Sequence, residues 1–294
     1  MAIYGGIEAG GTKFVCVVAG GPDDIRMETR FPTTYPDETL KRAVHFFKDE
    51  ASQLPIEALG IASFGPVDLE HSSSTYGFIT TTPKPGWANT DIAGRLKNAL
   101  KLPVAFDTDV NAAAFSEYLW GASRGLDTSI YFTIGTGIGA GVIVAGKPVH
   151  GLVHPETGHI LVPHDLRLDP FPGICPYHGD CFEGLACGKA IQARWGQPAE
   201  ELPDDHPAWD LEANYIALAL TSQIYSLSPK RIVLGGGVMQ HIELFPRIRQ
   251  KVQTFLNNYI KSSVITERID SYIVPPGLGN RAGVMGAIAL AQDL

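Results

Sequence analysis

Apolar residues recur along the chain at two different spacings. Short, partly β-branched runs predict strands at residues 4–9, 14–18, 58–64, 104–106, 129–134, 140–144 and 231–234. Longer segments with apolar residues three and four positions apart predict helices at 37–50, 91–100, 110–120, 185–195, 211–227, 244–260 and 281–292. Strands and helices that alternate in this way imply an α/β fold with parallel strand pairing.

Each of three glycine-rich turns lies at the end of a predicted strand. They are Gly10-Gly11-Thr12-Lys13, Gly135-Thr136-Gly137-Ile138-Gly139 and Gly235-Gly236-Gly237. Taken singly, each of them can be explained as a tight turn without a ligand. Glycine also lets backbone N–H groups approach phosphate oxygens, and small hydroxyls add donors. Three such turns in one chain favour phosphate binding.

Two familiar phosphate-binding motifs do not match these turns. The first turn has its Lys and Thr transposed relative to a P-loop, and a strand follows it where a P-loop needs a helix. The second turn reads G-x-G-x-G-x-G between strands, so it is not a dinucleotide fingerprint. We therefore expect phosphate to be held by β-turn backbones from two domains.

Segments 9–20 and 135–146 resemble each other at an offset of 126 residues. They share three glycines or alanines and one valine at matching positions: Gly11/Gly137, Val18/Val144, Ala19/Ala145 and Gly20/Gly146. Two unrelated glycine hairpins can produce this number of identities. The alternative is a duplicated strand-turn-strand unit, one in each domain.

Composition limits the classes of protein to which this chain can belong. The 294 residues are 45% hydrophobic and 18% charged, which suits a compact enzyme with a real core. The net charge of −8 weighs against nucleic acid as a partner. The apolar runs fall short of a membrane span, and residues 1–20 do not form a signal peptide. We therefore expect no membrane association and a cytoplasmic location.

Three of the four cysteines lie close together in a pattern that favours a metal over disulfides. His159, Cys175, His178 and Cys181 form a His-x15-Cys-x2-His-x2-Cys pattern, while Cys16 lies far away. Such a pattern builds a tetrahedral zinc site from one local knuckle and one distant ligand. Four protein ligands close the site, so its zinc is expected to be structural. Glu156, three residues before the first ligand, is then a carboxylate held by a metal-braced loop.

The segment 106–111 (FDTDVN) places two carboxylates between a predicted strand and a predicted helix. One possibility is that Asp109 is the helix N-cap and has no other role, since aspartate is well suited to that position. The carboxyl end of a strand is also where α/β enzymes place catalytic groups. A general base there can take a proton from a sugar hydroxyl, a contribution of roughly 10²–10⁴-fold.

The remaining histidines do not fit the metal pattern. We expect His45, His71, His150, His206 and His241 to be surface or core residues without a functional role. His154 and His164 lie near the metal ligands in sequence but off their spacing, so we expect them to be bystanders.

Several segments together, in this order, resemble the ROK family of repressors, open reading frames and kinases. They are GGIEAGGTK, FDTDVNAAAFSE, FTIGTGIGAGVIVAG, HPETGH, the Cys/His pattern and IVLGGGV, and they span essentially the whole chain. The resemblance implies the actin-like, ribonuclease H-like fold of hexokinases, with two α/β domains around a cleft. We expect a small domain over residues 1–120 and a larger one, with the zinc loop, over 121–280. The last helix, 281–294, is expected to pack back on the first domain.

The resemblance implies a role for each matching residue. Asp109 would be the catalytic base, and the sugar would be bound by Glu156, His159, Asn111, Gly65 and Pro66. The nucleotide would be bound by Gly10, Gly11, Thr12, Lys13, Thr136, Gly137, Gly139, Gly235 and Gly236. The family also implies Mg²⁺ with ATP, structural Zn²⁺ and a homodimer.

The chain departs from the family pattern at three places. Glu8 replaces the usual aspartate before the first turn, and it can help to organise Mg²⁺. The zinc loop is shortened, His178 replaces a cysteine, and Cys187 is expected to be a packed free thiol. Pro83 stands where many relatives carry a sugar-binding asparagine, with Asn89 as a weak substitute.

These features together look most like the bacterial fructokinase branch. The implied activity is phosphorylation of D-fructose to fructose 6-phosphate by ATP. The alternatives among enzymes are glucokinase, mannokinase and N-acylhexosamine kinase. A sugar-responsive repressor is a further alternative, but no helix-turn-helix precedes the first turn. The last alternative is a sugar-binding module without catalysis, against which Asp109 and the three turns argue.

Overall fold

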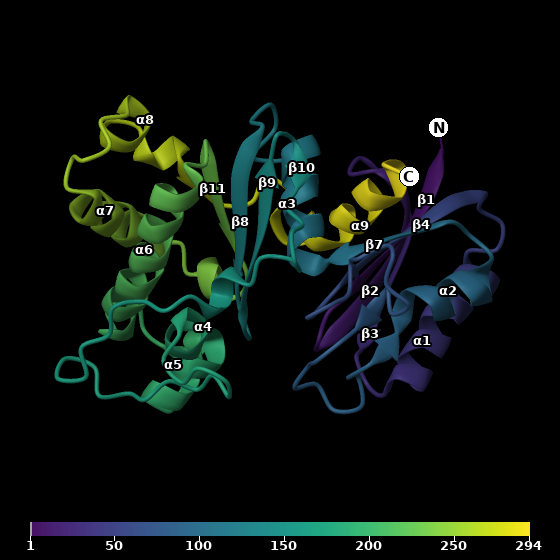
Figure 1. Ribbon diagram of the computed structural model, residues 1–294, viewed down its shortest axis with the longest axis horizontal. Helices are drawn as coiled ribbons and strands as arrows, with labels where there is room; N and C mark the ends of the chain where they lie inside the picture. The colour runs from purple at the N-terminus through teal and green to yellow at the C-terminus, as the bar shows by residue number, and fades with distance from the viewer. Residues whose placement is uncertain (1) are drawn as a thin grey trace.

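The computed structural model describes residues 2–294 as two five-stranded sheets in adjacent halves of the molecule (Figure 1). The first sheet has the order β3-β2-β1-β4-β7. Its strands are β1 (Ile3–Ala9), β2 (Lys13–Gly21), β3 (Asp24–Pro32), β4 (Ile56–Ser63) and β7 (Val104–Thr108). The first three strands pair antiparallel, whereas β4 and β7 continue the sheet in parallel with β1.

The second sheet repeats this arrangement with the order β10-β9-β8-β11-β12. Its strands are β8 (Thr128–Ile134), β9 (Ile138–Val144), β10 (Lys147–Pro148), β11 (Arg231–Gly235) and β12 (Ile273–Val274). The first three pair antiparallel, and β11 and β12 run parallel to β8. The similar segments 9–20 and 135–146 therefore occupy equivalent hairpins, which favours the duplicated unit over two unrelated turns.

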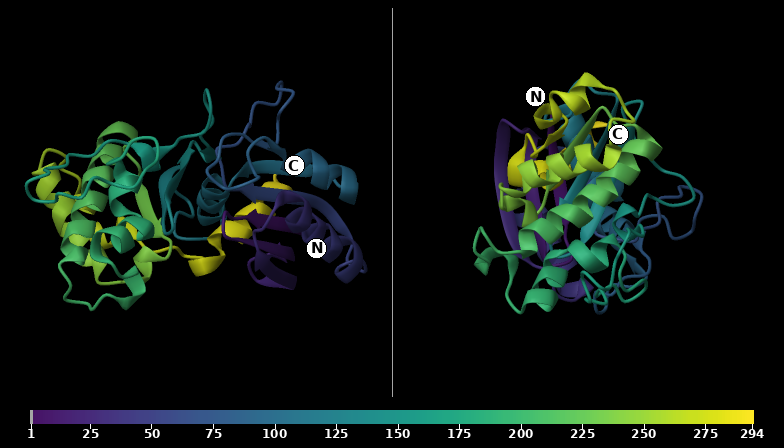
Figure 2. Two further views of the ribbon diagram at one scale, coloured as in Figure 1. Left: turned by 90° about the horizontal axis from the view of Figure 1, so that it is seen from below. Right: turned by 90° about the vertical axis from the view of Figure 1, so that its left-hand side faces the viewer.

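Helices flank both sheets, and the two halves lie side by side along the long axis of the molecule (Figure 2). The helices of the first half are α1 (Pro36–His45), which continues as a π-helical turn (Phe46–Glu50), α2 (Ile92–Leu100) and α3 (Asp109–Leu119). Those of the second half are α4 (Phe182–Ala186), α5 (Gly188–Trp195), α6 (Ala208–Leu227), α7 (Leu244–Leu256) and α8 (Ser263–Thr266). The chain ends with α9 (Ala282–Gln292), and a small ribbon of β5 (Phe78–Ile79) and β6 (Thr90–Asp91) completes the regular structure.

Helices α3 and α9 connect the halves (Figure 1). Helix α9 packs on β1 and β4 of the first sheet, and α3 packs on both α9 and β9 of the second. The two helices approach so closely that a Cβ on Gly286 would lie 2.2 Å from the backbone of Ala112. The division of the chain into domains at residue 120 stays a prediction, since α3 contacts both sheets.

The predicted α/β class is confirmed, and each predicted strand and helix has a counterpart in the structure. The sequence did not predict the short elements β5, β6, β10, β12 and α8. Strand β3 was not predicted, because its alternating charged residues suit an exposed edge strand as well as a loop. The predicted helix at 185–195 is two helices, α4 and α5, separated by the extended backbone of Cys187. The predicted helix at 244–260 ends at Leu256, because Asn257 adopts the left-handed conformation that caps it. Within residues 2–294, no helix has both the length and the hydrophobicity needed to cross a bilayer.

Candidate functional site

Asp109 is the first residue of α3, directly after β7. The N-cap is Thr108, whose hydroxyl accepts a hydrogen bond from the backbone N–H of Asn111 at 3.0 Å. The possibility that Asp109 serves only as the helix cap is therefore wrong. Its carboxylate accepts a bond from its neighbour, Val110 N at 2.9 Å. The Asp109 side chain is thus left available for chemistry.

Two other carboxylates, Glu8 on β1 and Glu156 just before the 3₁₀ turn at Thr157–His159, act on Asp109. Burial, together with the negative charges of Glu8 and Glu156, raises the pKa of Asp109 to about 7. Burial also raises the pKa of Glu156 to about 7. The pKa of Glu8, on β1, is raised by burial against the opposing charges of Lys13 and Arg30. An acid with a pKa near the working pH is suited to general base catalysis.

Asp107 connects the start of α3 to the second half of the molecule. It is 2% exposed, and its Oδ1 accepts a bond from Asn111 Nδ2 at 2.8 Å. Its Oδ2 lies 2.8 Å from Nε2 of His150, which comes from the loop after β10. Within residues 2–294, the buried Oδ1 of Asn111 has no hydrogen-bond partner. That oxygen is an acceptor that a sugar hydroxyl can satisfy.

The second and third glycine turns lie next to each other. Gly236 has a φ of +96°, and a Cβ there would lie 2.4 Å from the carbonyl oxygen of Ile134, just before the second turn. The backbone of Gly135 is held in turn by Gly188 N, which donates to its carbonyl at 2.7 Å. Thr136 and Gly237 are exposed at this place. Two turns distant in sequence therefore offer backbone N–H groups to one region.

The first glycine turn closes the β1–β2 hairpin. Gly10 N donates to Lys13 O at 3.0 Å, and Thr33 Oγ1 donates to the carbonyl of Gly10 at 2.6 Å. Thr12 and Lys13 are exposed, so their donors are free to meet a ligand.

Gly139 has a packing function in the structure. A Cβ on it would lie 2.9 Å from Cγ1 of Val110, because β9 crosses α3 at this point. The close approach brings the second turn next to the helix that begins at Asp109. The nucleotide contact expected of Gly139 stays a prediction.

Glu183 is a site residue that the sequence analysis missed. It lies on α4, and its Oε2 accepts a hydrogen bond at 2.8 Å from the backbone N–H of Ile138 in the second turn. Its charge also contributes to the raised pKa of Glu156. The available signal was a carboxylate two residues after the last metal ligand, Cys181.

Three of the histidines expected to have no function make specific contacts. His150 pairs with Asp107, as described above, and His154 is buried and contacts both Val67 and Glu156. His164 is also buried, with Nδ1 3.0 Å from Oδ2 of Asp180 and Nε2 2.9 Å from the carbonyl of Asp169. All three lie outside the metal cluster, as their spacing predicts, and their lack of a functional role stays a prediction. Sequence spacing does not show the contacts that the fold gives them.

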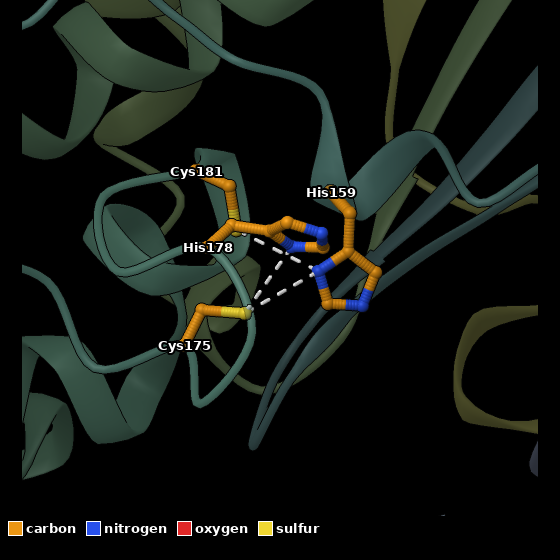
Figure 3. Close-up of side chains that lie close together, drawn as sticks. All are labelled: His159, Cys175, His178 and Cys181. Carbon is orange, nitrogen blue, oxygen red and sulfur yellow. Dashed lines mark hydrogen bonds between the residues drawn. The ribbon is translucent and has the colours of Figure 1, made fainter. Parts of the chain in front are cut away.

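The four predicted metal ligands converge (Figure 3). Their ligand atoms all lie within 4.8 Å of one another. Cys175 Sγ is 3.7 Å from His159 Nδ1 and 3.5 Å from His178 Nδ1. Cys181 Sγ is 3.6 Å from His159 Nδ1. Zinc–ligand bonds of about 2.0–2.3 Å at tetrahedral angles place neighbouring ligand atoms about 3.6 Å apart, so this donor set fits zinc.

Cys187 is not part of this cluster. It is a buried free cysteine between α4 and α5, and burial raises the pKa of its thiol to about 11. These properties agree with the packed free thiol that the sequence suggests.

The predicted Gly65–Pro66 segment follows β4, and its peptide bond is cis. A Cβ on Gly65 would lie 3.7 Å from the imidazole of His154. Pro83 and the weak candidate Asn89 are both exposed. These two stay without an assigned contact.

Comparison with known proteins decides the family. The model of the ROK family matches residues 4–294. The chain belongs to the ROK family. It is 51% identical to a putative fructokinase of Bacillus subtilis over 99% of this chain and 96% of the relative. It is 46% identical to a fructokinase of Zymomonas mobilis over 98% of this chain and 96% of the relative.

A solved structure shows the fold. A ROK family glucokinase from Streptomyces griseus, in complex with glucose and AMPPNP, has a TM-score of 0.80 and 24% identity to this chain. The match covers 100% of both chains. The predicted two-domain hexokinase-like fold is thereby confirmed.

Proposed function

We propose that this ROK protein is an ATP-dependent hexose kinase that converts D-fructose to fructose 6-phosphate. The observation that carries the proposal is the carboxylate of Asp109 at the start of α3. It does not cap the helix, and its pKa is raised to about 7. It lies beside two other acids and close to a glycine turn. The two relatives named fructokinases support the choice of sugar.

In this proposal Asp109 accepts the proton of the 6-hydroxyl while that oxygen attacks the γ-phosphorus of ATP. The bond between the γ-phosphorus and the β,γ-bridging oxygen breaks, and ADP leaves. A base with a pKa near 7 is about half deprotonated at neutral pH and is basic enough to take the proton. The reaction is therefore a phosphoryl transfer in which the protein supplies positioning and charge.

The glycine turns are proposed to hold the phosphates through their backbone N–H groups. The contacts are assigned to Gly10, Gly11, Thr12, Lys13, Thr136, Gly137, Gly139, Gly235 and Gly236. Mg²⁺ bound with ATP supplies positive charge that offsets the charge of the phosphates. Glu8 is close enough to influence Asp109 and can orient water around that ion.

The sugar is proposed to lie between the start of α3 and the metal-braced loop. Asn111 offers a free buried acceptor, and Glu156 and His159 offer polar groups from the opposite side. Gly65 and Pro66 close the pocket next to His154. Zinc at His159, Cys175, His178 and Cys181 has no open position, so we assign it a structural function.

Asp109→Asn tests this function directly. We expect kcat for fructose to fall roughly 10²–10⁴-fold in a coupled ADP-release assay, since the amide cannot accept the proton. Asp127→Asn is the matched control, because Asp127 is exposed and pairs with Lys230 away from the site. Near wild-type turnover of Asp109→Asn would exclude the general base.

The same assay separates fructose from the alternatives glucose, mannose and N-acetylmannosamine. We expect the highest kcat/KM with fructose, and a preference for glucose would favour the glucokinase alternative. We further propose that the protein forms a homodimer, as the family resemblance implies. Within each chain, the boundary between the two domains is proposed at residue 120. Sedimentation and limited proteolysis test these two points. A cytoplasmic location agrees with the reduced state needed by the cysteine ligands.

A further inference from the structure

The loop between β10 and the 3₁₀ turn at Thr157–His159 is tied to the first half of the molecule at two points. His150 Nε2 lies 2.8 Å from Asp107 Oδ2 at the end of β7. Four residues further on, Nε2 of His154 accepts a hydrogen bond at 3.2 Å from the backbone N–H of Val67, which follows β4. Because the loop then ends at Glu156, the position of this acid depends on both contacts.

The hydrogen bond from Val67 determines where His154 carries its proton. An N–H can donate only to a ring nitrogen that has no hydrogen, so Nε2 is unprotonated. A neutral imidazole then has its single proton on Nδ1. This nitrogen lies 3.4 Å from Oε1 of Glu156. The Nδ1–H of His154 thus faces the carboxylate of Glu156, with the backbone of Pro155 as its other neighbouring hydrogen-bond partner.

We propose that His154 is a positioning residue that fixes the carboxylate of Glu156 in the sugar site. The imidazole is 4% exposed and accepts the hydrogen bond from the backbone N–H of Val67, whereas the Glu156 side chain is 42% exposed. In this proposal the Nδ1–H of His154, 3.4 Å from Oε1 of Glu156, directs that oxygen and leaves Oε2 to a sugar hydroxyl. The contact to sugar rests on the function proposed above, but the His154 geometry does not.

The charges and burial around this pair agree with a neutral imidazole. Burial lowers the pKa of His154, with Asp107 and His150 acting on it in opposite directions. Glu156 faces the charges of Glu183 and Asp109, and its pKa is raised mainly by burial.

Two substitutions separate the bonds that His154 makes. The amide of asparagine can replace Nδ1, so His154→Asn keeps a donor for Glu156 and loses the acceptor for Val67. The amide of glutamine can replace Nε2, so His154→Gln keeps the acceptor for Val67 and loses the donor for Glu156. A buried N–H without a partner destabilises the fold, whereas a lost donor at the carboxylate weakens sugar binding.

We expect opposite results from the two variants. His154→Gln should raise KM for fructose roughly tenfold or more, as for loss of a bond to a charged group, with the KM for ATP within about twofold. His154→Asn should keep KM for fructose within about threefold but lower Tm by roughly 2–4 °C. His45→Asn is the control for both, because His45 is exposed and its ring pairs with Asp49 and Glu50 on the outer helix of the first half. Equal rises in KM, or a rise shared by ATP, would overturn the proposal.

The pH profile gives a second test. The acid limb of kcat/KM for fructose should move to higher pH in His154→Gln, because Glu156 loses the donor that favours its charged form. His154→Asn should keep the wild-type limb. An unchanged limb in both variants would contradict the positioning role.

NMR of ¹⁵N-histidine-labelled wild-type protein tests the geometry without any activity. The expected signal of His154 is that of a neutral ring with hydrogen on Nδ1, and a ring with hydrogen on Nε2 or on both nitrogens would overturn the inference. If the wild-type protein phosphorylates no hexose, the proposed function fails, while this spectrum still decides whether His154 is placed as described.

Discussion

At the scale of single residues, the site is built from acids whose pKa values are moved toward neutrality. The pKa of Asp109 is raised to about 7, mainly through burial and in part through neighbouring carboxylates. The pKa of Glu156 is raised in the same direction, but its side chain is 42% exposed, so solvent weakens that shift. Burying a carboxylate costs free energy unless the group is paired or hydrogen-bonded. The concentration of such groups around the start of α3 is therefore the strongest physical sign of a catalytic centre.

This electrostatic coupling predicts a pH dependence of catalysis. A base must be deprotonated to act, so kcat/KM for fructose should rise with pH through about 7 and level off above it. The apparent pKa belongs to the coupled pair of Asp109 and Glu156, because each acid affects the other. A pH–rate profile measures this apparent pKa. A kcat/KM for fructose that does not change between roughly pH 5 and pH 8 would contradict the assignment.

The pair of His150 and Asp107 predicts a pH dependence of stability. The hydrogen bond to Asp107 raises the pKa of His150 in the folded protein above its unfolded value of about 6.5. The stabilisation is therefore fully present below about pH 6.5 and is lost as pH rises through the folded pKa. We expect the Tm of His150→Asn to fall below that of the wild type at low pH and to approach it at high pH. Because His150 is 47% exposed, solvent keeps the difference small.

At the scale of elements, the position of Asp109 depends on how closely α3 approaches its neighbours. Glycines at Gly139 and Gly286 allow β9 and α9 to approach α3 without a side chain between them. The acid at the start of α3 is then held against both sheets. The prediction of a strand–helix junction at Asp109 was correct because hydrophobic spacing and the 106–111 segment are local features.

Gly286→Ala tests this packing. A Cβ there would lie 2.2 Å from the backbone of Ala112, so α3 and α9 must separate. Overpacking of this kind typically costs about 1–3 kcal/mol, which chemical denaturation can measure. Gly151→Ala is the control, since its nearest contact would be the Val153 carbonyl oxygen at 3.8 Å. Equal stabilities of the two variants would show that the helices adjust without cost.

At the scale of the whole molecule, the metal cluster lies in the chain between segments proposed to bind the sugar and the nucleotide. His159 follows Glu156 in the chain, and Cys181 precedes Glu183, which holds the backbone of Ile138. His164 pairs with Asp180, the residue before the ligand Cys181, and this contact stabilises the ligand loop. One structural ion would thus order both regions, which lie on different segments of the second half.

Removal of the metal should therefore affect binding before it unfolds the protein. We expect chelation to release about one zinc per chain and to raise KM for fructose while far-UV circular dichroism stays largely unchanged. Cys175→Ser should have the same effect, whereas Cys187→Ser, outside the cluster, should keep its metal. Elemental analysis reads out both variants. If no metal is found in the wild type, the kinase proposal still stands on Asp109, but the bracing by zinc does not.

Sequence alone was enough to predict most of the longer strands and helices, the three glycine turns and the spacing of four metal ligands. These are properties of short segments, and each follows from local hydrophobic period or from residue type. Strand β3, the break at Cys187 and the contacts of His150, His154 and Glu183 were decided by the tertiary structure. They depend on residues that are distant in the chain, such as Val67 and His154, 87 positions apart. Packing alone brings such residues together, and it also fixes which nitrogen of His154 carries its proton.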